Sequence, residues 1–253
     1  MPRRPLPRIA LVTLLVSLVG CGGVAVSPTP TSSPHPGRAS RPAPPPTLPA
    51  DATLVAAARS QRFRIFKHPG PGAVLSARQP GVNDWRQPIW LPAIDAFADA
   101  DGAVWYEVRL PVRPTGATGW VRADDVRTRE LRERIVVDLS AHRLWRHVAG
   151  QRTRSFTVGV GAPTTPTTPG RFFVWARVPT GDPTGSYGVF ALGLSGFSDV
   201  ITDWVGGGRL AIHGTSDPAD RGFDVSHGCV RVFNPQMRTL ADVPMGTPVW
   251  IRR

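Results

Sequence analysis

Two short stretches near the C-terminus, Leu210–Thr215 (LAIHGT) and Ser226–Arg231 (SHGCVR), decide how this chain folds and reacts. The chain has two cysteines, and because Cys21 lies in the N-terminal segment, Cys229 is the only thiol expected in the folded part. An apolar run that ends in His213 is typical of a buried strand with a polar side chain at its end. Alternate residues of an extended segment point to one side. We therefore expect His227 to project together with Cys229.

Three interpretations of this cluster remain open from the residues. Cys229 is a buried structural thiol, or His213, His227 and Cys229 bind Zn²⁺ at an open site. In the third interpretation a histidine activates Cys229 as a nucleophile, and backbone N–H groups hold the oxyanion. The sequence favours the nucleophile, because two histidines, small residues and an arginine surround the only thiol.

The N-terminal sequence is typical of an export signal. Arg3, Arg4 and Arg8 precede the apolar run 9–19, which is shorter than a helix needs to cross a bilayer core of about 30 Å. The run ends at Cys21 in a pattern that resembles the bacterial lipobox. The alternative is an ordinary secretory signal. We expect a signal peptide at 1–20, lipidation of Cys21, and a location in the cell envelope at the outer face of the cytoplasmic membrane.

Residues 21–50 are rich in Pro, Ser and Thr and have few large apolar side chains. Such a segment buries too little surface to offset its ordering entropy, which predicts an extended tether. The net charge of +12 comes almost entirely from arginine, and Lys67 is the only lysine. A basic surface attracts anionic wall polymers, membrane or nucleic acid. The linear sequence has no basic cluster interleaved with aromatics, so we expect no nucleic-acid partner.

Two folded regions are expected, both mostly β. Residues 51–129 carry short strand-like runs broken by Gly, Pro and Asp, which predict a small all-β barrel. The runs 105–111 and 119–121 resemble the late strands of bacterial SH3-like modules. Residues 51–60 are expected to form a short helix or an ordered lead-in. The strands expected here cover 62–66, 73–75, 90–94, 105–110 and 119–121.

Residues 130–253 are expected to form a second, β-rich domain with one or two short helices. A helix is predicted over 234–242, because Pro235 suits a first helical turn. The strands expected here cover 134–139, 143–147, 155–161, 170–176, 189–192, 209–213 and 247–251.

The second region resembles the L,D-transpeptidase (YkuD-type) catalytic domain over about residues 132–252. His213-Gly214-Thr215 and Ser226–Arg231 match the family's His-Gly-Thr and Ser-His-Gly-Cys signatures. Upstream, 158–161 and the Thr/Pro-rich stretch to Phe172 resemble a further family motif, from which Thr168 departs. Tyr187-Gly188 also fits.

The resemblance implies acyl transfer by Cys229 with His213 as the proton donor and acceptor. The imidazole would be held by a backbone carbonyl near Gly214 in place of a carboxylate. The oxyanion would be held by His227 with the Gly228 and Cys229 amides, and the catalytic set includes Ser226. The substrate-binding residues it implies are Gly214, Thr215, Arg231 and Tyr187. Arg231 forms a structural salt bridge in an alternative interpretation, and Asp217, Asp220 and Asp224 are expected to be loop and turn residues.

The implied reaction joins peptidoglycan stem peptides in 3→3 cross-links, without a cofactor or metal. Spacing alone leaves His213 and His227 open as the base. The same catalytic residues would serve an L,D-carboxypeptidase or a protein-to-peptidoglycan transferase. A non-catalytic wall-binding lipoprotein is the alternative from another class. Neither the acceptor nor the oligomeric state can be read from the residues.

Overall fold

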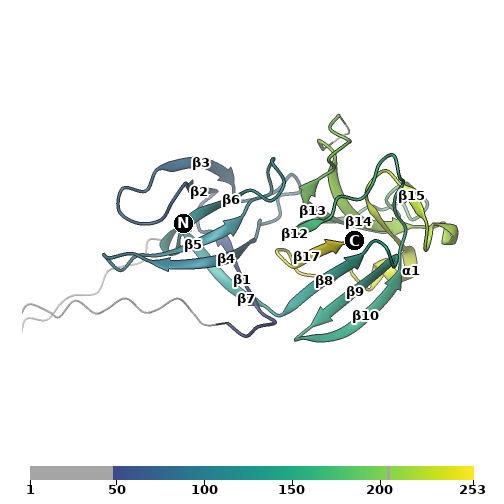
Figure 1. The fold of residues 1–253 in the computed structure, drawn as a ribbon, viewed down its shortest axis with the longest axis horizontal. Helices are drawn as coiled ribbons and strands as arrows, with labels where there is room; N and C mark the ends of the chain where they lie inside the picture. The colour runs from purple at the N-terminus through teal and green to yellow at the C-terminus, as the bar shows by residue number, and fades with distance from the viewer. Residues whose placement is uncertain (1–47, 204–205) are drawn as a thin grey trace, which may run out of the picture. The chain divides into compact units, whose positions relative to one another are not determined.

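The computed structural model describes residues 48–203 and 206–253, and these residues are mostly β, as predicted (Figure 1). The predicted signal peptide, Cys21 and nearly all of the predicted tether lie outside the described residues. Among the described residues, no helix is both long and apolar enough to cross a membrane.

The first sheet has seven strands in the order β3-β2-β6-β5-β4-β1-β7. Its strands are β1 (Thr53–Ala58), β2 (Arg62–Phe66), β3 (Leu75–Pro80), β4 (Leu91–Ala98), β5 (Val104–Arg109), β6 (Thr118–Arg122) and β7 (Val126–Leu131). The strands expected near 62–66, 105–110 and 119–121 are confirmed as β2, β5 and β6. The SH3-like assignment of this region stays a prediction.

The helix considered for residues 51–60 is wrong, because β1 occupies this stretch. Val55 and Ala56 pair with β4, and the whole strand pairs with β7. A strand with a partner on each side satisfies its backbone groups in the sheet. Burial of Val55 to Ala58 therefore outweighs the helical preference of the three alanines.

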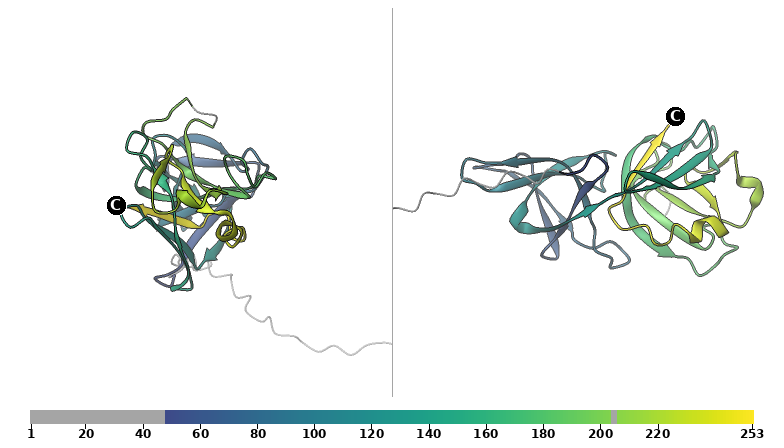
Figure 2. Two further views of the ribbon diagram at one scale, coloured as in Figure 1. Left: turned by 90° about the vertical axis from the view of Figure 1, so that its right-hand side faces the viewer. Right: turned by 90° about the horizontal axis from the view of Figure 1, so that it is seen from below.

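The second sheet has eight strands in the order β10-β9-β8-β17-β12-β13-β14-β16, and β11 and β15 form a separate pair (Figures 1 and 2). The strands are β8 (Glu133–Asp138), β9 (Arg143–Val148), β10 (Gln151–Thr157), β11 (Val160–Gly161), β12 (Gly170–Pro179), β13 (Phe190–Phe197), β14 (Arg209–Thr215), β15 (Asp224–Ser226), β16 (Val230–Phe233) and β17 (Pro248–Arg252). Three pairs are parallel: β17 with β8, β14 with β16, and β11 with β15.

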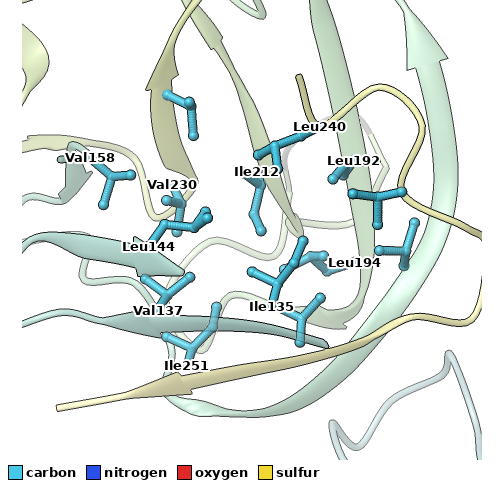
Figure 3. Packing of buried hydrophobic residues seen from close by; sticks show 14 of the residues in the cluster. Ile135, Val137, Leu144, Val158, Leu192, Leu194, Ile212, Val230, Leu240 and Ile251 are labelled. Carbon is cyan, nitrogen blue, oxygen red and sulfur yellow. The ribbon is translucent and has the colours of Figure 1, made fainter. Parts of the chain in front are cut away.

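Figure 3 shows the apolar core of this region, to which strands far apart in sequence contribute. Ile135, Leu144, Leu192 and Ile212 are each fully buried within it. Alternate residues of a strand face opposite ways, so the residues next to these four in sequence point to the other face of the sheet. This core includes Leu210 and Ile212 of β14, the strand that carries His213.

The predicted helix is shorter than expected, since α1 spans Asn234–Arg238. Pro235 lies in its first turn, as predicted. After it the chain continues as turns, with the amide of Leu240 bonded to Met237 and that of Val243 bonded to Leu240. Two 3₁₀ turns, Ala123–Asp125 and Pro218–Asp220, complete the helical content of the described residues.

Candidate active site

The parallel pairing of β14 with β16 brings the two signature stretches together. Ile212 lies opposite Val230, and His213 lies opposite Arg231. Cys229 immediately precedes β16, so this register places it beside Ala211, whose backbone forms a hydrogen bond with the thiol. Ala211 and His213 are alternate residues of one strand and share a face. Cys229 and His213 therefore open onto the same side of the sheet.

A tight turn, and no extended strand, carries Cys229. The Ser226 hydroxyl donates to the Cys229 carbonyl (2.5 Å) and accepts from the Gly228 amide (3.1 Å). Gly228 has φ of +112°, which glycine adopts without strain. The expectation that residues 227–229 are extended is wrong, although His227 and Cys229 still line one pocket. His227 is exposed, whereas Ser226 is buried.

His213 is the buried base candidate. Its Nδ1 lies 2.9 Å from the Gly214 carbonyl oxygen, the backbone contact that the family resemblance implied. A carbonyl only accepts, so Nδ1 carries the proton and Nε2 keeps its lone pair. Burial lowers the pKa of His213 to about 4, which the Gly214 contact opposes and Arg231 reinforces. The imidazole is therefore neutral at pH 7 and able to accept a proton.

Cys229 is also uncharged in this state. Burial raises the pKa of its thiol, against the smaller lowering effects of the Ala211 backbone and the Arg231 charge. The thiol and the imidazole are both neutral, so they do not form a thiolate–imidazolium ion pair before the reaction. The proton must leave the sulfur as the reaction proceeds, which calls for general-base assistance.

Arg231 is tied to a buried acid that the sequence analysis underrated. Its Nη1 lies 3.2 and 3.3 Å from the two carboxylate oxygens of Asp220, which is 6% exposed. The Thr215 hydroxyl donates to the same carboxylate at 2.6 Å. Asp220 is thus a buried anchor within a 3₁₀ turn. The salt-bridge interpretation of Arg231 has its partner in this contact.

Of the other two acids, Asp217 conforms to its prediction and Asp224 does not. Asp217 accepts from the Ala219 amide at the start of a 3₁₀ turn. Asp224 belongs to strand β15, and its carboxylate lies 2.8 Å from His142 Nε2. The loop and turn assignment is therefore wrong for Asp224.

The upstream Thr/Pro-rich motif supports the cysteine turn. Thr165 donates its hydroxyl to the Ser226 carbonyl at 3.0 Å, and the Ala162 amide reaches the same oxygen at 2.8 Å. A Cβ on Gly161 would lie 2.3 Å from the Thr167 nitrogen, so no larger residue fits there without moving the backbone. This motif therefore acts on the site through Ser226.

Asn234 positions a second wall of the site, and the sequence analysis missed it. Its side chain accepts from the Val189 amide (3.0 Å) and donates to the Pro183 carbonyl (2.7 Å). The loop held in this way carries Tyr187, whose ring packs edge-on against His213 with centroids 5.1 Å apart. An Asn directly before a helical proline was the available signal.

One pocket of about 220 Å³ collects most of the predicted site residues. It is lined by Tyr187, His213, Ser226, His227, Cys229 and Arg231, and also by Arg209, which was not predicted. Arg209 lies between the rings of Trp175 and Phe197, at 3.8 and 4.3 Å from their centroids.

Three predicted residues are not among the pocket's lining residues: Gly214, Thr215 and Gly228. A Cβ on Gly214 would lie 2.3 Å from Asn234 Oδ1, so this glycine is needed for packing. Within 48–203 and 206–253, no group of three or more His, Cys, Asp or Glu side chains is arranged to hold a metal ion.

Sequence comparison finds a family that this part of the chain resembles. Residues 132–251 match the YkuD family model, described as the L,D-transpeptidase catalytic domain. This region is therefore similar to a class of enzyme domain, the L,D-transpeptidase catalytic domain.

Two curated relatives carry the name putative L,D-transpeptidase YkuD. The relative from Bacillus subtilis is 32% identical over 120 residues, and the one from Bacillus licheniformis is 33% identical over 119 residues. Each alignment covers 47% of this chain, and the chain spans 65% and 64% of the relatives' lengths.

Solved structures of L,D-transpeptidases are also similar to this chain. The Enterococcus faecium enzyme is 26% identical, with a TM-score of 0.37, over 47% of this chain and 49% of that chain. The Mycobacterium smegmatis enzyme is 18% identical, with a TM-score of 0.38, over 60% and 91%.

Proposed function

We propose that this protein is a cell-wall L,D-transpeptidase that uses Cys229 as its nucleophile and His213 as its general base. The single observation that carries the proposal is the shared pocket of the Cys229 thiol and a neutral His213 whose Nδ1 is bonded to a carbonyl. That bond leaves Nε2 as the proton acceptor. The match of residues 132–251 to the L,D-transpeptidase catalytic domain supports the same chemistry.

The first half-reaction is acyl transfer to the cysteine. As Sγ of Cys229 attacks the carbonyl carbon between the third stem residue and D-Ala, Nε2 of His213 takes the thiol proton. The resulting imidazolium returns this proton to the departing D-Ala amine as the C–N bond breaks. A thioester on Cys229 remains.

The second half-reaction returns the enzyme to its starting state. The side-chain amine of a neighbouring stem attacks the thioester carbonyl and gives up a proton to His213. When the C–S bond breaks, the sulfur leaves with the electron pair and recovers a proton from His213. The product is a 3→3 cross-link, or a shortened stem if water is the acceptor.

The oxyanion requires a donor that is not already committed. The Gly228 amide donates to Ser226, so we assign the oxyanion mainly to the Cys229 amide, with His227 at the pocket wall. Asp220 holds Arg231 through Nη1 at the pocket edge. We assign to Arg231 the recognition of a stem carboxylate, because a guanidinium presents several donors in one plane.

The proposed setting is the cell envelope. The lipobox-like end at Cys21 and the Pro-rich stretch that follows support an exported, lipid-anchored protein on a tether. The SH3-like region at 51–129 would bind the wall or space the active site from the membrane.

The test is mass spectrometry of the purified full-length protein incubated with a disaccharide-tetrapeptide. A thioester on the protein followed by a cross-linked dimer supports the transpeptidase. A hydrolysed tripeptide without dimer would make the enzyme a carboxypeptidase. In Cys229→Ala we expect no adduct and no D-Ala release.

The chain contains one matched control, since Cys21→Ala removes its other thiol. We expect Cys21→Ala to retain full turnover. Equal activity of the Cys229→Ala variant and the wild type would contradict the proposal.

A further inference from the structure

The outer face of β8, β9, β17 and β12 carries arginines stacked on tryptophans. Trp250 is on β17, which pairs with β8 on one side and β12 on the other. Arg134 of β8 and Arg171 of β12 both lie over its ring, with guanidinium carbons 4.2 and 4.5 Å from the ring centroid. Arg152, on β10, lies 5.2 Å from the centroid of the Trp145 ring on β9. Arg252 approaches the same Trp145 ring at 5.9 Å. We call this set of six residues the Arg–Trp face.

The strand register assembles this face from separate parts of the sequence. Trp145 lies opposite Val136, Val136 lies opposite Trp250, and Trp250 lies opposite Arg171. One row of side chains thus crosses four adjacent strands, which lie side by side in Figure 1. The sequence analysis found no basic cluster interleaved with aromatics, because this cluster exists only once the strands have paired.

A groove runs over the face. It has a volume of about 720 Å³, and Trp145, Arg152, Arg171, Trp250 and Arg252 are among its lining residues. The active-site residues line a different pocket. The groove is therefore a separate feature of the domain, and the proposed reaction does not use it.

The positive charge of the face is poorly balanced. Within the described parts of the chain, Arg134, Arg152 and Arg171 have no carboxylate within salt-bridge distance, and only Arg252 pairs with an acid, Asp138, at 3.2 Å. Because each guanidinium lies within 4.5 Å of the same ring centroid, the charges of Arg134 and Arg171 are at most about 9 Å apart and repel each other. An anion bound at the face would relieve this repulsion.

His147 reports the same local potential. It lies opposite both Arg134 and Arg152 in the strand register. Its pKa is lowered, first by burial and then by the charges of these two arginines. The effect of the two arginines on this pKa agrees with a positive potential at the face, and His147 Nδ1 is buried without a hydrogen-bond partner in the described structure.

The stacked arginines are prepared to bind an oxyanion. A guanidinium that lies over an aromatic ring is restrained in position before a ligand arrives, and its N–H donors suit the oxygen atoms of an oxyanion. Arg134 Nε is buried and has no hydrogen-bond acceptor among the described residues. Guanidinium groups that are restrained by ring contacts before binding lower the entropy cost of ordering them on a ligand.

From this arrangement we propose that the Arg–Trp face binds a linear polyanion whose repeating charge is a phosphodiester joined by short aliphatic linkers. The lining supplies N–H donors and aliphatic surface from Val136, and few acceptors. It therefore suits a ligand whose charged atoms only accept and whose linkers have few hydroxyl groups. A chain of sugar acids has many hydroxyl donors, which this lining would leave unpaired.

Two other phosphodiester or phosphate sources fit the face less well. Bases of single-stranded nucleic acid stack on open aromatic rings, whereas arginines cover Trp145 and Trp250. Attachment to a membrane surface uses protruding apolar side chains, whereas the tryptophans here are only partly exposed at the floor of a groove. A wall polymer of glycerol phosphate, with one hydroxyl group in each linker, has the required chemistry.

The test measures binding of the full-length protein to a synthetic glycerol-phosphate oligomer over a range of salt concentrations. The variant Arg152→Gln/Arg171→Gln removes two exposed cations of the face. We expect at least about tenfold weaker binding and a log K against log salt slope reduced by about two. The matched control is Arg59→Gln/Arg78→Gln, which removes two exposed arginines of the 51–129 region, changes the net charge equally, and should bind like the wild type.

The outcome separates the ligand classes as well. Tighter wild-type binding to the glycerol-phosphate oligomer than to single-stranded DNA, a polyuronate or anionic vesicles of phosphatidylglycerol supports the proposal, and tighter binding to any of these three overturns it. Equal losses in the two variants would show a general charge effect and also overturn it. Failure of this binding leaves D-Ala release by Cys229 untouched, so the proposed function is judged separately.

Discussion

The active-site pocket and the Arg–Trp face both combine arginine with histidine, but the arginines have opposite partners. In the pocket, Arg231 is bound by the buried carboxylate of Asp220. On the face, Arg134 and Arg171 are stacked on Trp250 and have no acid partner in the described structure. The charge of an arginine paired with an acid is already balanced, so the arginine mainly positions neighbouring residues. The charge of an arginine stacked on an aromatic ring stays available to a ligand.

The two histidines sharpen this comparison, because burial lowers the pKa of both. His213 has a carbonyl partner for Nδ1, and this partner directs Nε2 as a base. His147 Nδ1 has no hydrogen-bond partner among the described residues. A lowered pKa therefore does not mark a base by itself, and the hydrogen bond that fixes the tautomer makes the difference.

The largest expected effect comes from removing the proposed base. In His213→Gln we expect D-Ala release from the tetrapeptide to fall by about 10²- to 10⁴-fold, because general-base catalysis contributes this much. Steady-state kinetics measures it. The matched variant His147→Gln should stay within about twofold of the wild type. A comparable loss in both variants would remove the functional distinction between the two histidines.

His213 should also make stability depend on pH. The unfolded chain binds a proton at this residue near pH 6.5, whereas the folded protein binds it only near pH 4. Between these values the unfolded state holds more protons, so the free energy of unfolding falls as the pH falls. The shift corresponds to about 3 kcal/mol lost across this window.

Urea unfolding of the wild type and His213→Gln at several values between pH 7 and pH 4 measures this contribution. The wild type should lose stability more steeply than the variant as the pH falls. Parallel curves for the two proteins would show that His213 is not protonated at a depressed pKa.

The salt bridges of the two regions should differ in strength. Asp220→Asn leaves Arg231 partly buried without its charge partner, and we expect a cost of about 2 kcal/mol in the free energy of unfolding. The matched change Asp138→Asn affects a pair whose arginine, Arg252, is 62% exposed, and should cost under about 1 kcal/mol. Chemical denaturation measures both costs. A larger loss in Asp138→Asn would reverse the comparison.

The sequence predicts the parts of the fold that depend on local pattern. Strands such as Arg62–Phe66 and Arg143–Val148 contain aromatic and branched apolar residues close to turn residues, and their bounds were found nearly as expected. β1 was not expected to be a strand, because its alanines favour a helix and only pairing with β4 and β7 decides its structure. Pairing partners far away in sequence cannot be read from a local pattern.

The same limit applies to the site. Cys229 and His213 stand in short motifs and could be named from the sequence. Asp220 and Asn234 act through contacts that the folded loops create. Nothing in its neighbouring residues distinguishes Asp220 from an ordinary turn residue, and the Pro235 that follows Asn234 indicates a helix start but not the contacts of the Asn234 side chain. Charge counted along the chain also gives no hint of the Arg–Trp face, which depends on strand register.

The smallest expected effect tests whether the Arg–Trp face contributes to stability. Exposed cation–π contacts contribute about 0.5–1 kcal/mol each, so Arg152→Gln/Arg171→Gln should lower the free energy of unfolding by about 1 kcal/mol. Tetrapeptide turnover should stay within about twofold, since neither side chain lines the active-site pocket. Arg59→Gln/Arg78→Gln gives the baseline for removing two charges. A loss of several kcal/mol relative to that baseline would mean that these arginines hold the sheet together, and their lack of acid partners would then not indicate a ligand.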